Sequence, residues 1–441
     1  MIVINYNNVC EYVDVAIAKG VKTDLAVIER LLDFLGNPHH KMNVIHITGT
    51  NGKGSTAAFV SSILTAMRYK VGLFTSPHLS DFRERVQIGN KKINKSNVCE
   101  LISKIKTASE KLEIVPSFFE LMLILGVMYF RQQNCDFVVA EVGIGGRLDS
   151  TNVFFGRVCA ITGIDFDHME LLGATKLDIA REKAAIVKPG SVMIANVKER
   201  GLFEFIERES MARNVHEVVN VDSVVKGVMT SMDTSGIDFT IDSPSFSFKK
   251  FHSRLTGDYQ LENIKTAICI IESLKKLKLI EIDQAAVKNG IEKTFWPGRF
   301  EIIKYEGHDY LLDGAHNVNG IEALSRNLKS MFKGRKVRSI ISIISSKQYD
   351  AMLKIVSEIS SEIIIVGIKN TKKKVDSAAL LKYASEFCPA SSFFENFSEA
   401  LDYLKASISD ELVCITGSLY LVGEARNVLM NSIANRELER S

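Results

Sequence analysis

The sequence predicts an α/β fold in which a mostly parallel sheet domain with a small antiparallel excursion is followed by a second, smaller α/β domain. Three observations predict it. Short apolar runs alternate with longer segments of helical period, the pattern of buried parallel strands and covering helices. This alternation occurs twice along the chain. The chain also has 441 residues, more than one hydrophobic core usually supports.

The apolar runs are expected to form the strands, because short continuous apolar segments suit strands that are buried on both faces. In the first part of the chain we expect strands at 44–47, 71–74, 137–140, 158–161 and 192–195. In the second part we expect them at 310–312, 338–343, 363–366 and 412–415. The segment 223–251 alternates instead and has turn residues at Gly236, Asp242 and Pro244, which predicts the antiparallel excursion.

A domain boundary is expected at Pro297-Gly298, where a Pro-Gly pair breaks regular structure and a new strand pattern begins soon after. We therefore predict domains at 1–296 and 297–441, the second of them Rossmann-like. The longest apolar run, 118–130, is interrupted by Glu120 and is too short to cross a bilayer. It is expected to be a buried helix.

Composition and charge exclude several classes of protein. The formal net charge is +3, and no basic block indicates a nucleic-acid or membrane surface. The seven cysteines lie far apart without a CxxC pair, which argues against a zinc site or a dense disulfide framework and favours a reducing compartment. The first residues lack the pattern of a signal peptide. We expect a cytoplasmic protein with no nucleic-acid or membrane partner.

A glycine-rich loop follows the first predicted strand and precedes a helical segment at 56–67. Glycines allow the backbone N–H groups to point at phosphate oxygens, the helix N-terminus adds positive potential, and a lysine adds a charge. The spacing differs from the standard Walker A motif, and the alternative is an ordinary glycine-rich turn. We interpret the loop as an ATP site whose contacts are Gly49, Thr50, Asn51, Gly52, Lys53, Gly54 and Ser55.

Polar side chains stand at or beyond the ends of four predicted strands: Ser76, Glu141, His168 and Asp313. Ligands bind at the carboxyl edge of open α/β sheets, so these groups and the loop are expected to converge there. Carboxylate, hydroxyl and phosphate oxygens suit Mg²⁺. Each residue also has a plainer role, because Glu141 could cap a loop, His168 could be a buried core residue, and Ser76 could begin a turn.

Seven further strings follow the loop string GTNGKGS in order: 75–79 (TSPHL), 141–149 (EVGIGGRLD), 167–168 (DH), 181–184 (REKA), 297–299 (PGR), 313–317 (DGAHN) and 416–420 (TGSLY). With this spacing, the chain resembles the folylpolyglutamate synthase and dihydrofolate synthase family, relatives of the muramyl-peptide ligases. The resemblance covers the chain from about residue 24 to residue 424. It implies that the first domain binds ATP and that the second contributes to ATP and glutamate binding.

The resemblance also implies a metal site. It assigns Mg²⁺ ligation to Ser76, Glu141 and His168. In the family, a lysine similar to Lys183 is carbamylated, which turns a cation into an anion that helps bind a second magnesium ion beside His168. The plain alternative for Lys183 is a solvated side chain on an amphipathic helix.

A pterin-binding pocket is a further implication of the resemblance. Ser117 and Glu120 form a capping-box pattern before the apolar helix, which by itself explains them. Aromatic faces and a carboxylate suit a flat heterocycle that carries amino groups, although core packing explains the aromatic residues equally well. The resemblance assigns substrate contacts to Asp24, Phe118, Phe119, Glu120, Leu148, Asp149 and Ser150.

For the second domain, the resemblance implies that Arg299 and Asp313 contact the nucleotide together with Asn263. It gives weaker support for His316 as the group that orients or deprotonates the amine and for Ser418 as a contact of glutamate. The family commonly has His-Gln before this Asn, whereas here Tyr259 precedes Gln260. Tyrosine cannot repeat the charge of a protonated histidine, so the details of the ATP contact are open.

These assignments predict an ATP- and Mg²⁺-dependent ligase that activates a carboxylate as an acyl phosphate and couples it to L-glutamate. Lys53 would stabilise charge on the transferred phosphoryl group. The acceptor could be dihydropteroate, a reduced folate or both, and we expect a monomer. A muramyl-peptide-type ligase is the alternative within the class, but those relatives typically have Thr or Ser directly after the lysine. A P-loop ATPase switch would leave the strings around His316 and Ser418 unexplained.

Overall fold

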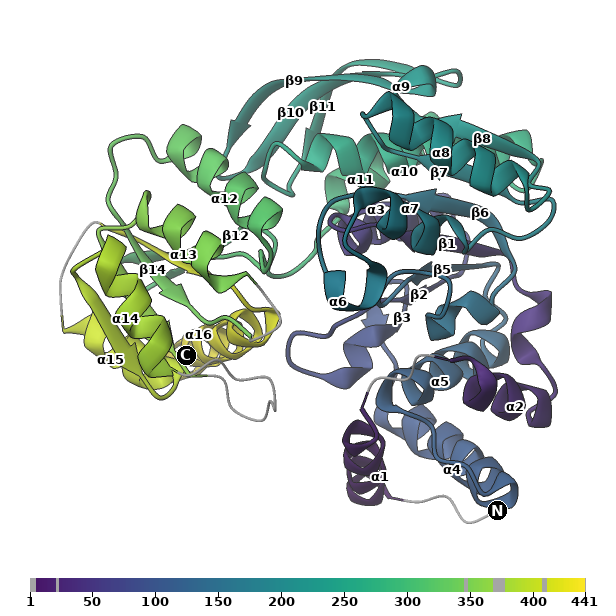
Figure 1. The fold of residues 1–441 in the computed structure, drawn as a ribbon, viewed down its shortest axis with the longest axis horizontal. Coiled ribbons are helices and arrows are strands. Elements are labelled where there is room, and N and C mark those ends of the chain that lie inside the picture. Colours follow the sequence, from purple (N-terminus) through teal and green to yellow (C-terminus); the bar gives the residue numbers. More distant parts are fainter. Residues whose placement is uncertain (1–4, 21–23, 345–347, 368–376, 407–410, 441) are drawn as a thin grey trace.

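The computed structural model describes residues 5–20, 24–344, 348–367, 377–406 and 411–440. Figure 1 shows an N-terminal part built around a large sheet and a C-terminal part built around a second sheet. The predicted α/β fold is confirmed. The division at residue 296 stays a prediction, although the sheet of the C-terminal part begins only at β12 (Glu301–Tyr305).

Within the described residues, the first sheet has eight strands in the order β4-β3-β2-β5-β1-β6-β7-β8. The strands β2, β5, β1, β6, β7 and β8 run parallel, whereas β3 and β4 form an antiparallel edge. The five predicted strands lie at its centre. The bounds are β1 Val44–Thr48, β2 Val71–Phe74, β3 Val86–Ile88, β4 Lys91–Lys92, β5 Phe137–Glu141, β6 Gly156–Ile161, β7 Val192–Ala195 and β8 Glu217–Asn220.

Successive residues of the central strands point to opposite faces, and each face is covered by helices. Ile45 of β1 belongs to a core with α3, α10 and α11, whereas Val44 belongs to a core with α1, α2, α4 and α5. Both faces are therefore buried. The covering helices are α1 Tyr6–Ala18, α2 Ala26–Phe34, α3 Lys53–Ala66, α4 Lys95–Leu112, α5 Phe118–Gln132, α10 Gln260–Lys276 and α11 Gln284–Lys293.

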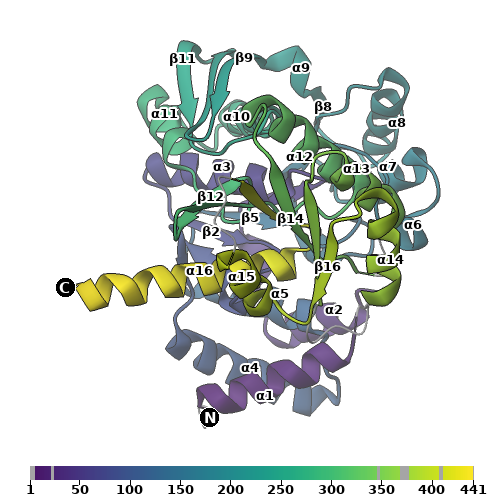
Figure 2. The same ribbon diagram turned by 90° about the vertical axis from the view of Figure 1, so that its left-hand side faces the viewer.

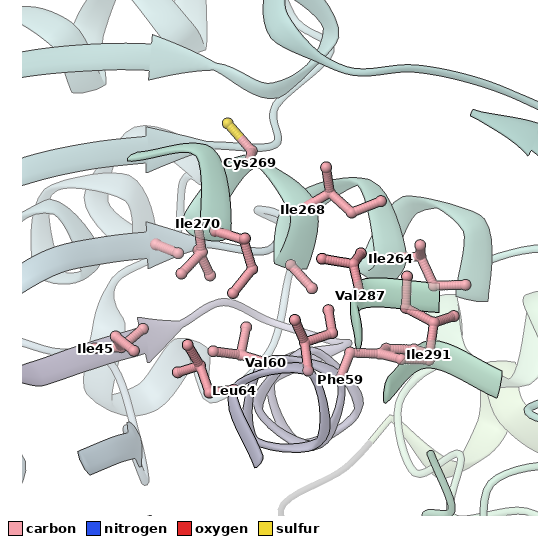
Figure 3. Close-up of a cluster of buried hydrophobic side chains, with 14 of the residues drawn as sticks. Ile45, Phe59, Val60, Leu64, Ile264, Ile268, Cys269, Ile270, Val287 and Ile291 are labelled. Atoms are coloured by element: carbon pink, nitrogen blue, oxygen red, sulfur yellow. The ribbon is translucent and has the colours of Figure 1, made fainter. Parts of the chain in front are cut away.

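The helix that follows the glycine-rich loop, α3, is almost entirely buried. In Figure 3, its side chains Phe59, Val60 and Leu64 lie between Ile45 of β1 and the helices α10 and α11. A Cβ added at Gly290 of α11 would lie 2.5 Å from the Cα of Ile63, so α11 packs directly on the α3 backbone. This packing fixes the helix whose N-terminus faces the candidate site.

The predicted antiparallel excursion is a three-stranded sheet in the order β11-β10-β9, which comprises β9 Lys226–Asp233, β10 Gly236–Asp242 and β11 Ser247–Ser253. It joins the core of α3 and α10 through buried aromatic residues such as Phe239 and Phe251. The remaining short elements of this part are η1 Pro38–Lys41, η2 Phe82–Arg85, η3 Ser150–Val153, α6 Met169–Leu172, α7 Lys176–Ala184, α8 Arg200–Met211 and α9 Val221–Val224.

Among the described residues of the C-terminal part, six strands form a sheet in the order β12-β13-β17-β14-β15-β16, with only β12 antiparallel to its neighbour. The four predicted strands are present, although the one expected at 338–343 ends at Ile341. Figure 2 shows α16 running out to the C-terminal end. The other bounds are β13 His308–Leu312, β14 Val337–Ile341, β15 Glu362–Val366, β16 Ser391–Phe394, β17 Leu412–Thr416, α12 Val318–Met331, α13 Tyr349–Ser357, α14 Ser377–Phe387, α15 Phe397–Lys405 and α16 Leu419–Arg440.

The apolar run at 118–130 forms the buried helix α5, as expected. In the described parts of the chain, no helix has both the length and the apolar character that crossing a bilayer requires.

Candidate active site

A cavity of about 780 Å³ is lined by residues of both parts of the chain. The first part contributes the loop between β1 and α3, the ends of β2 and β5, and residues of α7 and α10. The second part contributes the segments that follow β13 and β17. The cavity therefore lies at the carboxyl edge of the first sheet, where open α/β sheets bind ligands.

The glycine-rich loop requires glycine at two positions. Gly49 has φ +152°, and a Cβ there would lie 1.9 Å from Oγ1 of Thr162. Gly52 has φ +81°, and a Cβ there would lie 2.2 Å from Oδ1 of Asn263. Both contacts are far too short for a side chain, and positive φ adds backbone strain. The loop conformation thus depends on these two glycines.

Two lysines meet at the loop backbone. Nζ of Lys53 donates to the carbonyl oxygens of Gly49 (3.0 Å) and Thr50 (3.2 Å). Nζ of Lys183, which is buried, donates to the same Gly49 carbonyl (2.9 Å). Burial, and then the positive charge of Lys53, lowers the pKa of Lys183 to about 7. A substantial fraction of Lys183 is therefore an uncharged amine at neutral pH.

Glu141 at the end of β5 is a buried carboxylate in the cavity wall. Its Oε2 accepts a hydrogen bond from the backbone N–H of Ser76 (2.9 Å). Burial raises the pKa of Glu141, and the nearby Lys53 partly offsets this effect. Within the described residues, no group of three or more His, Cys, Asp or Glu side chains is placed to hold a metal ion. A cation here would depend on Glu141, hydroxyl groups and ligand oxygens, which is the usual arrangement for Mg²⁺.

His168 lines the cavity in the left-handed conformation, with φ +51°. Its backbone N–H donates to Oδ1 of Asp167 (2.9 Å). The left-handed conformation is uncommon for a residue with a side chain and tends to be kept at functional sites. The structure thus brings Ser76, Glu141, His168 and Lys183 to one cavity, as the metal hypothesis requires.

Side-chain amides join the loop to the second sheet domain. Asn317, just before α12, donates to Oδ1 of Asn51 (3.1 Å) and to Oδ2 of Asp167 (3.0 Å). Asn51 donates in return to Oδ1 of Asn317 (3.3 Å) and of Asn319 (3.0 Å). We call Asn51, Asp167, Asn317 and Asn319 the amide contact. It holds the start of α12 against the glycine-rich loop.

Asp313, directly after β13, is buried and accepts three hydrogen bonds. The donors are the N–H groups of Phe300 (2.9 Å) and Ala315 (2.8 Å) and the hydroxyl of Tyr259 (3.2 Å). Burial, and then the charge of Asp313, keeps the pKa of Tyr259 well above its ordinary value, so the hydroxyl stays a donor. Tyrosine at this position provides a neutral hydrogen bond between the two parts of the chain, where a histidine could provide a charge.

Replacing Tyr259 with phenylalanine is expected to lower the free energy of unfolding by about 1 kcal/mol, because a hydrogen bond is lost but Asp313 keeps two backbone donors. Urea denaturation measures the change. Tyr403→Phe is the matched control, since its hydroxyl also donates to a carboxylate, Glu362 (2.9 Å), but its side chain is exposed. Equal losses in the two variants would contradict a special role for the Tyr259 contact.

The aromatic end of the cavity carries most of the residues predicted to contact a pterin. Phe118, Phe119 and Leu148 line it, and so do Asp149 and Ser150. Asp149 is buried, and its carboxylate accepts hydrogen bonds from the backbone N–H groups of Ile144 (2.9 Å) and Thr151 (3.0 Å). Burial raises the pKa of Asp149. Its carboxylate therefore also holds the chain turn that presents Leu148.

Two of the predicted substrate contacts do not reach the cavity. Glu120 is buried, and its Oε2 accepts from the N–H and the hydroxyl of Ser117 (2.7 Å each), so the capping box uses this carboxylate. Asp24 is exposed and accepts from the N–H of Ala26 (3.0 Å) at the start of α2. Neither residue lines the cavity as the structure describes it, and their assignment as substrate contacts stays a prediction.

The other predicted site residues line the cavity, including Asn263, Arg299, His316 and Ser418. The sequence reasoning gave no role to Thr162, Tyr259, Asn317 or Arg85. Tyr259 and Asn317 lie in or beside strings that were singled out, so their position was a usable signal. Thr162 directly follows a predicted strand, so it carried the same strand-end signal as Glu141. Arg85 carried no such signal, since it lies beyond the string at 75–79.

Comparisons with known proteins agree with this geometry. Residues 47–271 match the Mur ligase middle domain, and residues 298–419 match the Mur ligase glutamate ligase domain. The chain is 32% identical to the dihydrofolate synthase/folylpolyglutamate synthase of Bacillus subtilis over 93% of this chain and 96% of that protein. It is 31% identical to the folylpolyglutamate synthase of Lacticaseibacillus casei over 97% and 99%.

Solved structures give the same result. The folylpolyglutamate synthase of Thermotoga maritima has a TM-score of 0.84 at 31% identity, with 97% of each chain covered. The Mycobacterium tuberculosis folylpolyglutamate synthase complexed with ADP has a TM-score of 0.88 at 27% identity, covering 96% of this chain and 99% of that chain. The fold and the cavity thus define an ATP-dependent ligase of the Mur type. Within that class, the chain belongs to the folylpolyglutamate synthase/dihydrofolate synthase family.

Proposed function

We propose that this protein adds L-glutamate to dihydropteroate, to a reduced folate, or to both, by ATP-dependent formation of an acyl phosphate and then of an amide. The observation that carries the proposal is the composition of one cavity. A phosphate-binding loop with Lys53 faces His316 and Ser418 of the second sheet domain, and an aromatic end with Phe118 and Phe119 adjoins them. ATP, a flat acceptor and an amino acid each have matching groups there.

The nucleotide would lie on the loop. The N–H groups of Gly52, Lys53 and Gly54 at the start of α3 and the Lys53 ammonium suit its phosphates, and Asn263, Arg299 and Asp313 are assigned to the rest of the nucleotide. The acceptor carboxylate would attack the γ-phosphoryl group in line, with Lys53 offsetting the developing charge. Positioning and electrostatics supply the catalysis, since no covalent enzyme intermediate is needed.

Magnesium fits the cavity wall, because the buried carboxylate of Glu141, which accepts a single hydrogen bond from the described residues, adjoins the hydroxyl-bearing Ser76. We assign Mg²⁺ to Ser76, Glu141 and His168. When bound, it would neutralise phosphate charge and orient the transferred group.

His316 is suited to act on the incoming amine. Its Nδ1 lies 2.7 Å from the carbonyl oxygen of Gly314. A carbonyl oxygen only accepts, so Nδ1 carries the proton, and in the neutral ring Nε2 keeps its lone pair. Nε2 can then accept a proton from the ammonium group of glutamate, and Ser418 is assigned to hold that amino acid. The cavity between the sheets would shield the acyl phosphate from water.

The function is tested with an ATP-coupled assay that supplies glutamate with dihydropteroate or with tetrahydrofolate. ADP release that requires both glutamate and an acceptor, together with a new amide detected by mass spectrometry, is the expected result. Activity with one acceptor or with both decides between the synthase activities. Nucleotide hydrolysis that ignores both substrates would instead indicate a P-loop switch, and activity only with muramyl peptides would indicate the other ligase type.

Lys183 is proposed to be carbamylated in the active enzyme. The uncharged amine would attack CO₂, forming an N–C bond and releasing one proton, and the low pKa of Lys183, about 7, makes this amine available. We expect a carbamate signal in ¹³C NMR of protein equilibrated with ¹³C-bicarbonate, absent in Lys183→Ala. A plain amine in the electron density of a well-ordered, metal-bound crystal would contradict the proposal.

We also propose that the protein is a monomer and lies in the cytoplasm. All seven cysteines are free, which suits a reducing compartment. Size-exclusion chromatography with light scattering tests the oligomeric state.

A further inference from the structure

Arg85 is the last residue of the short helix η2, and backbone hydrogen bonds fix its position. Asp81 and Glu84 form a capping box around this turn. The carbonyl oxygen of Arg85 accepts from the N–H of Thr75 (3.1 Å), which ties the turn to the end of β2. The position of Arg85 is thus set by the sheet that carries the rest of the site.

The side chain of Arg85 is 7% exposed. Its Nε donates to Nδ1 of His78 (2.9 Å), and its guanidinium lies 4.9 Å from the ring centre of Phe118. Among the described residues, its two terminal nitrogens form no hydrogen bond, and Arg85 forms no ion pair within 4.0 Å. Burial lowers the pKa of Arg85 to about 10, so it stays cationic at neutral pH.

The charges of Glu141 and Glu84 act on Arg85, but among the described residues neither carboxylate forms an ion pair with it. A buried cation without a close ion pair is costly, and proteins seldom keep one without a use. Arg85 lines the cavity, so an anionic group of a ligand can reach it. The loop with Lys53 already serves phosphate, whereas Arg85 lies against the aromatic residue Phe118. The two terminal NH₂ groups form a planar fork that matches a carboxylate.

The second sheet domain covers this part of the cavity. A Cβ added at Gly423 of α16 would lie 2.0 Å from the carbonyl oxygen of Leu79, so α16 packs directly on the segment that also carries His78. Ser418, immediately before α16, lines the same cavity as Arg85. An amino-acid ligand between Phe118 and the start of α16 would thus meet Arg85.

We propose that Arg85 binds a carboxylate of the amino-acid part of the substrates, through a forked pair of hydrogen bonds. The inference rests on the proposed function. Two sources share this chemistry: the incoming glutamate, and the α-carboxylate of a glutamate that the acceptor already carries. Dihydropteroate has only its reacting carboxylate, whereas tetrahydrofolate carries a glutamyl tail, so the two acceptors separate the sources.

The experiment compares Arg85→Gln and Arg85→Lys with the parent in steady-state assays using each acceptor. We expect Arg85→Gln to raise one KM by about 10- to 100-fold, as the loss of a charge-assisted hydrogen bond predicts, with a much smaller change in kcat. A higher KM for glutamate with both acceptors assigns the incoming amino acid. A higher KM for tetrahydrofolate alone assigns the glutamyl tail. Arg85→Lys, which keeps the charge without the fork, should be intermediate.

Arg83→Gln is the matched control, because Arg83 lies on the same turn but is paired with Asp81 (2.5 Å). It should match the parent, since Arg83 does not line the cavity. Unchanged KM values in both Arg85 variants, or a loss of kcat alone, would overturn the proposal. ADP binding and thermal unfolding report whether the variants fold. If Arg85→Gln does not fold, the KM values of Arg85→Lys decide the assignment.

Failure of the proposed function has a different outcome, because the parent would then form no amide with either acceptor. The Arg85 assignment is then decided by equilibrium binding of glutamate, pteroate and pteroylglutamate to the parent and the variants. Weaker binding of glutamate or pteroylglutamate by Arg85→Gln supports it, whereas equal binding of all three ligands overturns it.

Discussion

Replacing Lys53 with alanine is expected to lower ATP-dependent amide formation by on the order of 100- to 1,000-fold, the usual effect of removing one group that stabilises transition-state charge. Lys53 is the first residue of α3, and its ammonium group also donates hydrogen bonds to the carbonyl oxygens of Gly49 and Thr50. The substitution therefore removes both the charge that we propose acts on the transferred phosphoryl group and two contacts that order the loop. Amide yield and ADP release, measured together, report the loss.

Lys91→Ala serves as the control, because Lys91 is an exposed lysine of the edge strand β4. It should retain the parent rate. The pKa of Lys183 should also rise in Lys53→Ala, since Lys53 is one of the causes that lower it. A Lys53→Ala enzyme with the parent rate would remove the basis for phosphoryl transfer at this loop.

Replacing Glu141 with glutamine is expected to lower the rate by a similar factor, because the proposed magnesium site loses its only carboxylate. The change is nearly isosteric, and the side-chain oxygen can still accept from the N–H of Ser76. Because the loss of a ligand weakens magnesium binding, part of the rate should return at high magnesium concentration if Glu141 is a ligand. Full activity at ordinary magnesium concentration would contradict the assignment.

Although Glu141→Gln should lower the rate, it should raise the free energy of unfolding. The raised pKa of Glu141 means that its charged form is disfavoured in the folded state, so the parent loses stability as the pH rises above the ordinary value of 4.5 and through the folded pKa. Glutamine does not titrate. In urea denaturation without metal or nucleotide, the variant should gain stability relative to the parent from pH 4.5 to neutral pH. A variant that is less stable throughout this range would show that the carboxylate stabilises the fold.

The central strands were predictable because they are buried on both faces and therefore read as continuous apolar runs. The strands that were missed, β3, β4, β8, β12 and β16, carry less of this signal. Lys91–Lys92 of β4 is two exposed lysines, and no residue of β8 or β16 is fully buried. Their pairing depends on neighbours that are distant in the sequence, which a local pattern does not contain.

The lining of the cavity was predictable where a polar side chain stands at or just beyond a strand end, as it does for Ser76, Glu141 and Asp313. It was not predictable where a side chain had two possible partners. Glu120 and Asp24 were expected at a ligand, but Glu120 accepts from the N–H of Ser117 and Asp24 from the N–H of Ala26, and neither lines the cavity. The role of Tyr259 was not predictable from its own segment, because its hydrogen-bond partner Asp313 lies in the C-terminal part of the chain.

The amide contact between Asn51, Asp167, Asn317 and Asn319 has a consequence for turnover. Hydrogen bonds of this type exchange for water at little net free energy, unlike a buried apolar interface. Separating the start of α12 from the loop therefore exchanges these polar contacts for contacts with water. A polar contact of this kind favours repeated separation of α12 from the loop, which would let ADP leave and ATP bind between rounds of synthesis.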